Sequence, residues 1–507
     1  NTGLGYSALA ANTTASNNAA VGYNALAANT TGASNTAVGR SALLANTTAS
    51  NNTAVGYGSL SSNTTGDLNT ALGYNTLATN TVGDRSVAIG YQALVSQEPS
   101  SNTDMYNTAV GFDAGKSVTT GKNNTIIGGL AGDAITTGSE NIAVGASALT
   151  SATTASNNLA IGFLAAGSTT TGGSNLAIGN YALDANTTAS FNTALGYFSL
   201  SANTTGASNT AVGRSSLEVN TTGSSNTAVG ELALVANTTA SNNTAVGKSA
   251  LVANTTGAFN VALGTSALGA NTTASQNTAV GAVSLDANTT GADNVAMGTS
   301  SLGVNTTGGQ NTGLGTNALG ANTTASNNTA VGMNALLSNT TGTRNVALGS
   351  LALDANTTAN DNTAVGYEAM GSNTTGQMNV AVGTYAFDAN TTGDFNVAVG
   401  RAALSANTTA DHNTAIGYQA LDVNSTGAQN TAVGSGALDA NTTADNNTAV
   451  GYLTLTANTT GTENTAVGSL ALDACTTGNN NTAMGHNSLS TNILSDHNVA
   501  IGNDALA

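Results

Sequence analysis

Residues 35–51 read NTAVGRSALLANTTASN, and this phrase of seventeen residues recurs along the whole chain of 507 residues. If the Thr of NTAVG is taken as position 1, its equivalents begin at residue 2 and return every seventeen residues, with one shift of register between 87 and 108. The chain therefore contains thirty repeats. Self-similarity at a short fixed period is typical of stacked structural units that bury their apolar side chains against one another.

Four columns of the aligned repeat hardly vary. Position 4 is always Gly, position 17 is Asn in all repeats but one, position 2 is nearly always Ala, and position 8 is mostly Leu. The columns that we select as structural sites begin with Asn18, Asn35, Asn52 and Asn69; Gly22, Gly39, Gly56 and Gly73; Ala20, Ala37, Ala54 and Ala71; and Leu26, Leu43, Leu60 and Leu77. The exceptions are Ser86 at position 17; Gly3, Gly313 and Ile126 at position 2; and Gly115, Gly132, Ala166, Met370 and Phe387 at position 8.

Seventeen residues are too few for a helical hairpin, because helical repeats need about thirty or more. Gly, Asn and β-branched Thr also disfavour helix. We therefore predict an all-β parallel β-roll or β-solenoid over residues 1–507, with short strands at TAVG and around position 8, and turns at NTT[GA]xxN. Four extra residues near 95–106, which include the only proline, Pro99, should form a surface loop. At ~4.8 Å per coil, thirty coils would make a rod roughly 140 Å long.

The alternation of side chains along TAV predicts which face of the strand is buried. Positions 1 and 3 are apolar or Thr, so we expect them to face the interior opposite the Leu of position 8. The Ala of position 2 would then point outward, and a small apolar column held on an outer face indicates contact with another chain. The alternative is that this alanine lines a second part of the same coil. The Gly of position 4 indicates an unusual backbone conformation or a close approach. The Asn of position 17 indicates a hydrogen-bonded ladder.

The composition excludes several classes of protein. The net charge is −17 and there are only eight Lys and Arg residues, too few for a surface that neutralises nucleic-acid phosphates. No apolar run is long enough for a membrane-spanning helix, so we expect no membrane insertion by this segment. No signal peptide is visible. The chain begins and ends within the repeat, at NTGLG and NDALA, so we expect it to be part of a longer array.

No pattern of residues indicates catalysis, and we predict no enzyme activity, catalytic residue, metal ligand or cofactor. The motifs G-x-S-x-G, H-E-x-x-H and the Walker loop are absent. His412 and His497 fall at a variable turn position and His486 at position 5. Asp recurs after the Leu of position 8, and such a column could bind calcium, but the GGxGxD signature of calcium-binding rolls is missing. These aspartates include Asp184, Asp354, Asp439 and Asp473. Cys475 replaces an Asn of the repeat, and as the only cysteine it cannot form an intrachain disulfide.

The NTT segment is also an N-glycosylation sequon, as in Asn46-Thr47-Thr48. A sugar could be attached there if the asparagine were exposed, whereas an asparagine inside a ladder could not be modified. We favour the unmodified form.

The segments SVAIGYQAL at 86–94 and NIAVGASAL at 141–149 resemble the head repeats of YadA-like trimeric autotransporter adhesins, which read roughly S/N-V-A-I-G-x-x-A-x-A. Related repeats occur in phage tail fibres. The resemblance implies a left-handed parallel β-roll, a side-by-side homotrimer, an extracellular or cell-surface location (or a virion fibre), and adhesion to a host-cell or surface receptor. The repeat here is longer than that of the family, and the sequence contains no stalk coiled coil or membrane anchor.

Two classes of function remain from the sequence. The first is an extracellular structural or adhesive fibre, either an adhesin or a phage tail-fibre shaft, whose partner is another copy of itself in a homotrimer or filament. The second is an ice-binding solenoid, because ranked Thr columns suit such a surface. Neighbouring threonines in T-T should point to opposite faces, however, whereas a flat array needs Thr-x-Thr.

Overall fold

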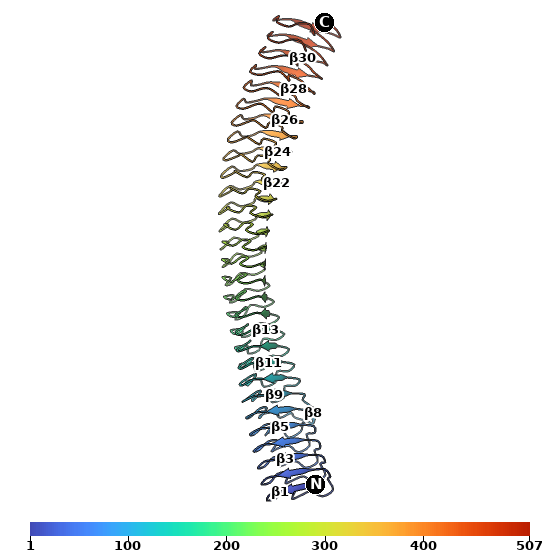
Figure 1. Ribbon diagram of the computed structural model, residues 1–507, viewed down its shortest axis with the longest axis vertical. Helices are drawn as coiled ribbons and strands as arrows, with labels where there is room; N and C mark the ends of the chain where they lie inside the picture. The colour runs from blue at the N-terminus through green and yellow to red at the C-terminus, as the bar shows by residue number, and fades with distance from the viewer. The chain divides into compact units, whose positions relative to one another are not determined.

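A computed structural model describes residues 1–507, and it shows a parallel β-solenoid with no helix (Figure 1). The chain divides into two compact units, Asn1–Ala258 and Phe259–Ala507, and both are built from the same 17-residue coil. Each unit contains fifteen three-residue strands, which occupy positions 1–3 of the repeat. We call these the triplet strands.

The triplet strands of the first unit are β1 (Thr2–Leu4), β2 (Ala19–Val21), β3 (Thr36–Val38), β4 (Thr53–Val55), β5 (Thr70–Leu72), β7 (Val87–Ile89), β9 (Thr108–Val110), β10 (Thr125–Ile127), β11 (Ile142–Val144), β12 (Leu159–Ile161), β13 (Leu176–Ile178), β14 (Thr193–Leu195), β15 (Thr210–Val212), β16 (Thr227–Val229) and β17 (Thr244–Val246). Those of the second unit are β18 (Val261–Leu263), β19 (Thr278–Val280), β20 (Val295–Met297), β21 (Thr312–Leu314), β22 (Thr329–Val331), β23 (Val346–Leu348), β24 (Thr363–Val365), β25 (Val380–Val382), β26 (Val397–Val399), β27 (Thr414–Ile416), β28 (Thr431–Val433), β29 (Thr448–Val450), β30 (Thr465–Val467), β31 (Thr482–Met484) and β32 (Val499–Ile501).

Within each unit, successive triplet strands pair in parallel and in register. In β3 and β4, for example, Thr36 lies beside Thr53, Ala37 beside Ala54 and Val38 beside Val55. Each repeat position therefore forms a column of equivalent side chains on neighbouring coils. The segment around position 8, which we predicted to be a strand, contains turns instead.

The four extra residues do not interrupt this sheet, because β7 pairs directly with β9. The longer coil instead forms a separate parallel pair between β6 (Gly83–Asp84) and β8 (Thr103–Asp104). In Figure 1, β8 is labelled to one side of the triplet strands. Residues 100–102 are exposed, as expected for a surface loop, whereas Pro99 is buried.

The interior is lined by positions 2, 7, 8, 11, 14 and 17, and this result corrects the predicted orientation of the strand. The alanines of position 2 point inward and are fully buried, so they do not form an outer column between chains. They include Ala20, Ala37, Ala54 and Ala71. The leucines of position 8 are also fully buried, including Leu26, Leu43, Leu60 and Leu77. Positions 1 and 3 point outward. The alternative explanation of the alanine column is therefore correct: these alanines line the interior of their own coil.

The reason is the narrow cross-section of the coil. A Cβ built on Gly3, at position 2, would lie 3.4 Å from the carbonyl oxygen of Ala8 and 3.6 Å from Leu9 Cδ1. The interior therefore has room for a methyl group at position 2 and for little more. The lack of space within the coil limits position 2 to Ala or Gly in every repeat except that of Ile126.

Glycine at position 4 is required by the backbone. Gly39 has a φ of 133°, a conformation that side chains strongly disfavour, and a Cβ on it would lie 2.5 Å from the carbonyl oxygen of Gly56. The same arrangement recurs through the column, including at Gly22, Gly39, Gly56 and Gly73. This glycine allows the chain to leave the strand while the coils remain closely stacked.

Candidate functional site

The asparagines of position 17 join each coil to the next. Asn18 Oδ1 accepts a hydrogen bond of 2.8 Å from the backbone N–H of Asn35, and Asn35 Nδ2 donates one of 2.8 Å to the carbonyl oxygen of Ala49. Asn52 and Asn69 repeat the pattern. The amides thus satisfy buried backbone groups at the start of the strand and in the turn.

A second ladder, at position 11, is formed by the asparagines of the NTT segment. Asn46 Nδ2 donates to Asn29 Oδ1 at 2.9 Å and also to the carbonyl oxygen of Ala49 at 3.0 Å. Asn46 is 0% exposed. Its burial agrees with our preference for the unmodified form of this sequon, because a glycosylated amide cannot occupy the interior.

Two breaks in these ladders show how closely the amides are matched. Ser86 lacks the amide that position 17 normally supplies, and the longer side chain of Gln97, at position 11, reaches across to bond Ser86 Oγ, Asn80 Oδ1 and Asn107 Nδ2. Cys475 has no such compensation: Asn458 Oδ1, one coil earlier, is buried without a hydrogen-bond partner. Burial raises the pKa of the Cys475 thiol, which favours its neutral form.

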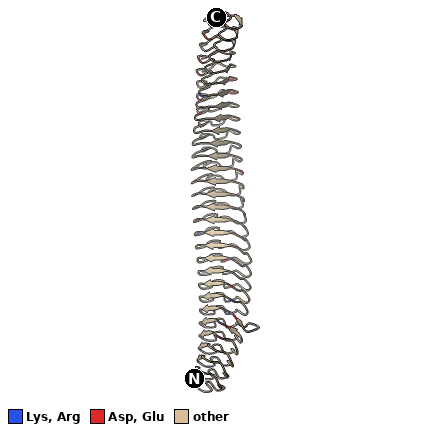
Figure 2. Ribbon diagram, turned by 90° about the vertical axis from the view of Figure 1, so that its right-hand side faces the viewer, with Lys and Arg blue, Asp and Glu red and all other residues tan.

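The outer face of the triplet strands, which we call the strand face, consists of positions 1 and 3. Position 3 is always aliphatic or Met and position 1 is Thr or aliphatic, so neither position carries a charge in any repeat. Figure 2, which colours charged residues, likewise shows these strands without colour. Val38 is 37% exposed and Leu72 is 46% exposed. Each unit therefore carries an uncharged, partly exposed apolar column along this face.

An aromatic column extends along position 5 of the first unit. Its members are Tyr6, Tyr23, Arg40, Tyr57, Tyr74, Tyr91 and Phe112. Neighbouring rings stack with centroids 5.1–5.3 Å apart, and the guanidinium of Arg40 lies 5.6 Å from the centroid of Tyr23 and 5.7 Å from that of Tyr57. Because the rings cover one another's faces, the column presents mainly ring edges to solvent.

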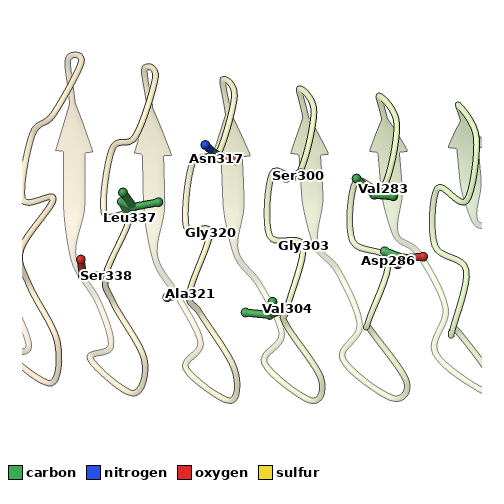
Figure 3. Close-up of a pocket in the computed structure, with 10 residues that line it drawn as sticks. All are labelled: Val283, Asp286, Ser300, Gly303, Val304, Asn317, Gly320, Ala321, Leu337 and Ser338. Atoms are coloured by element: carbon green, nitrogen blue, oxygen red, sulfur yellow. The ribbon is translucent and has the colours of Figure 1, made fainter.

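A groove with a volume of about 670 Å³ lies in the second unit, on the segment of positions 6–10 (Figure 3). It exists because Gly303 and Gly320 occupy position 9 in two consecutive coils, between the side chains of Val283, Val304 and Leu337. Asp286 lies at the end of the groove, where its carboxylate is close to Gly269. Apart from Asp286, the lining is apolar or carries the uncharged polar side chains of Ser300, Asn317 and Ser338.

The aspartates of position 9 are partly buried, and this burial raises the pKa of Asp184, Asp354, Asp439 and Asp473. One group of carboxyls comprises Asp354, Glu368 and Asp388, around Gly371. No group of three or more His, Cys, Asp or Glu side chains has an arrangement that could hold a metal ion.

The threonines of NTT differ in their roles. Thr30 Oγ1, at position 12, donates to the carbonyl oxygen of Thr47 one coil later, whereas the position-13 threonines, such as Thr48, are exposed. The turn therefore offers one free Thr column. The histidines form no cluster: His412 stacks on Phe395 at 5.0 Å, and His486 and His497 are exposed.

No helix in the structure has the length and apolar character that crossing a membrane requires. A scan against protein-family models gives no match, and a search of curated proteins gives none either. The resemblance to YadA-like head repeats therefore remains a prediction from the motif.

Proposed function

We propose that this chain is a structural segment of an extracellular fibre, whose copies associate side by side as a homotrimer through the strand face. The observation that carries the proposal is the uncharged, aliphatic and outward-facing position 3, repeated on every coil of both units. Soluble monomers rarely expose contiguous apolar patches larger than a few hundred Å². Burying such columns against another copy stabilises an assembly by roughly 25 cal/mol per Å² of apolar area.

In this proposal the contact between copies lies at positions 1 and 3 and not at the alanines of position 2. Each coil contributes only a small contact, but stacked coils repeat it in register, so the contacts act together once two copies are aligned. A left-handed winding belongs to the same proposal and is supported by the resemblance to YadA-like repeats.

Two biological settings suit such a segment: a cell-surface adhesin and the shaft of a phage tail fibre. In both, it would separate or present a part that binds a host cell or another surface. The low content of Lys and Arg argues against nucleic acid as the partner.

The test is the mass of the native chain in solution, measured by sedimentation equilibrium or light scattering. We expect a trimeric mass, and a monomeric mass would overturn the proposal. The variant Val212→Lys/Val229→Lys/Val246→Lys places charge on the strand face and should lower the affinity between copies. The matched control is Thr222→Lys/Thr239→Lys/Thr256→Lys, which adds the same charges to the exposed turn of the same coils and should leave the mass unchanged.

A second candidate, ice binding, is favoured by one observation: the strand face carries Thr at position 1 and an aliphatic residue two positions later. This pattern is closer to the Thr-x-Thr array that ice binding needs than the NTT turn is. In that turn, the threonines of one of the two Thr columns are hydrogen-bonded to the backbone. A thermal-hysteresis measurement separates the two candidates. Activity in the monomeric chain would replace the fibre proposal, and its absence would remove the ice-binding one.

A further inference from the structure

The repeat contains two kinds of N-x-T sequon, and the coil buries the asparagine of one kind and exposes that of the other. The first is the NTT of position 11. The second begins at position 16, where Asn-Asn runs into the Thr of the next strand. The asparagines of this second kind are Asn51, Asn123, Asn242, Asn327, Asn446 and Asn480.

The fold buries the sequons of position 11. From Asn29 onward their asparagines are 0% exposed, and their amides are used in the ladder. Asn237 is an example: its Nδ2 donates to Asn220 Oδ1 at 2.8 Å and to the carbonyl oxygen of Ala240 at 3.0 Å. Attaching a sugar to Nδ2 would remove a donor and place a bulky polar group in an interior that barely holds a methyl.

The sequons of position 16 begin at exposed asparagines. All six asparagines are exposed, and each lies at the tip of a turn with a φ between 57° and 64°. Asparagine tolerates this left-handed conformation better than most residues do. At Asn51 the threonine of the sequon, Thr53, is exposed as well.

We propose that these six asparagines are the sites at which the folded chain accepts N-linked sugar. In the reaction, Asn Nδ2 forms a bond to C1 of an activated sugar, and the bond from C1 to the diphosphate oxygen of the donor breaks. The diphosphate leaves with the electron pair, and a base of the transferase takes the proton from Nδ2. No oxidant or reductant is needed, and the donor is a nucleotide-linked or lipid-linked sugar.

The experiment uses the purified full chain, a soluble asparagine glucosyltransferase and a nucleotide-activated glucose as probe, with peptide mapping by mass spectrometry. We expect glucose on position-16 asparagines and none on Asn237 in the native chain. Urea-unfolded chain, transferred into reaction buffer just before the assay, should gain glucose on Asn237 too. The variant Thr244→Val keeps the shape of the strand residue and should abolish modification of Asn242 alone.

Because Thr244 lies on the strand face, association of copies could cover its sequon. The reaction is therefore also run on Val212→Lys/Val229→Lys/Val246→Lys. Glucose on Asn242 in this variant but not in the wild type would support both proposals: the sequon is accessible in the separate chain, and association of copies covers it. Glucose on native Asn237, or none at any position-16 site in either protein while the unfolded chain is modified, would overturn the inference. Neither of these results bears on the fibre proposal, which depends on the measured mass.

Discussion

Two stretches of the first unit have the same strand pairing but different side chains in the interior of the coil. From residue 186 to the end of the unit, position 11 is an unbroken run of asparagines whose amides bond from coil to coil, as in Asn203, Asn220 and Asn237. Between 108 and 175 the same position holds an aliphatic residue or Thr: Val118, Ile135, Ala152 and Thr169. The strands pair in the same register in both stretches. The backbone of the coil therefore does not depend on the amide ladder.

The comparison also shows why position 11 changes in a block. An amide in the ladder needs a partner on each side, so one isolated replacement leaves a buried group unsatisfied, as at Asn458 beside Cys475. In the stretch without the ladder, side chains adjust to one another in size. Ile126 replaces the usual Ala of position 2 where Gly115 and Gly132 replace the usual Leu of position 8, and Ile126 Cδ1 would lie 2.9 Å from a Cβ on Gly115.

The largest effect is expected for the feature that both stretches share, glycine at position 4. Gly145→Ala and Gly230→Ala should each cost more than about 3 kcal/mol, because both residues have a φ near 135° and a Cβ would lie 2.5 Å from the next carbonyl oxygen. Amide hydrogen exchange in the surrounding coils should then accelerate by roughly a hundredfold or more.

Gly129→Ala is the control for that measurement. A Cβ on Gly129 meets no atom within 4 Å, so hydrogen exchange should change by less than about threefold, within the usual ±0.5 kcal/mol of surface substitutions. Unequal losses in Gly145→Ala and Gly230→Ala would mean that the ladder does contribute to the backbone of position 4.

A smaller effect should separate the two stretches. Asn220→Ala leaves Asn203 Oδ1 without its donor and Asn237 Nδ2 without one acceptor, at a cost of about 2 kcal/mol. Ile135→Val, in the stretch without the ladder, removes one methylene and should cost about 1 kcal/mol. Local hydrogen exchange in the full chain measures both.

The double variant Asn220→Ala/Asn237→Ala tests whether the ladder acts as a unit. It removes two amides that bond each other, so its cost should be smaller than the sum of the two single costs. Additive costs would contradict the account of why position 11 changes in a block.

The period, the parallel solenoid, the buried columns of Leu and Asn, and the special backbone conformation of the Gly column follow from the sequence. A column that tolerates only one residue type needs a physical cause that all repeats share. The orientation of the strand did not follow. In TAV both sets of alternate positions are compatible with burial, and the choice depends on the width of the interior, which no single repeat reveals. The joint exception at Ile126, Gly115 and Gly132 was the available signal, because it links positions 2 and 8 across the interior.

Repairing the isolated break should have a stabilising effect of about 1 kcal/mol. In Cys475→Asn, the new amide can donate to Asn458 Oδ1, which now has no partner, and can continue the bond to Gly478. Hydrogen exchange around Thr459 and Thr476 should slow about fivefold. Cys475→Ala removes the thiol without adding a donor, so an equal gain in that variant would show that the missing amide is not the cause.

The smallest expected effect is electrostatic and concerns Asp354, Glu368 and Asp388 in the second unit. Burial, and then the neighbouring carboxylates, raise the pKa of Asp388 above its ordinary 3.8. The folded chain therefore binds this proton more tightly than the unfolded chain does. The resulting stabilisation is complete below pH 3.8 and is lost as the pH rises through the raised pKa of the folded state. Asp388→Asn should stabilise these coils at pH 7 by roughly 0.5 kcal/mol, because it removes one of three like charges. Local hydrogen exchange at pH 7 measures the gain, and Asp361→Asn, whose carboxylate is paired with Arg344, should show none. A gain in both variants would point to the net charge of the chain, rather than to this group of carboxylates, as the cause.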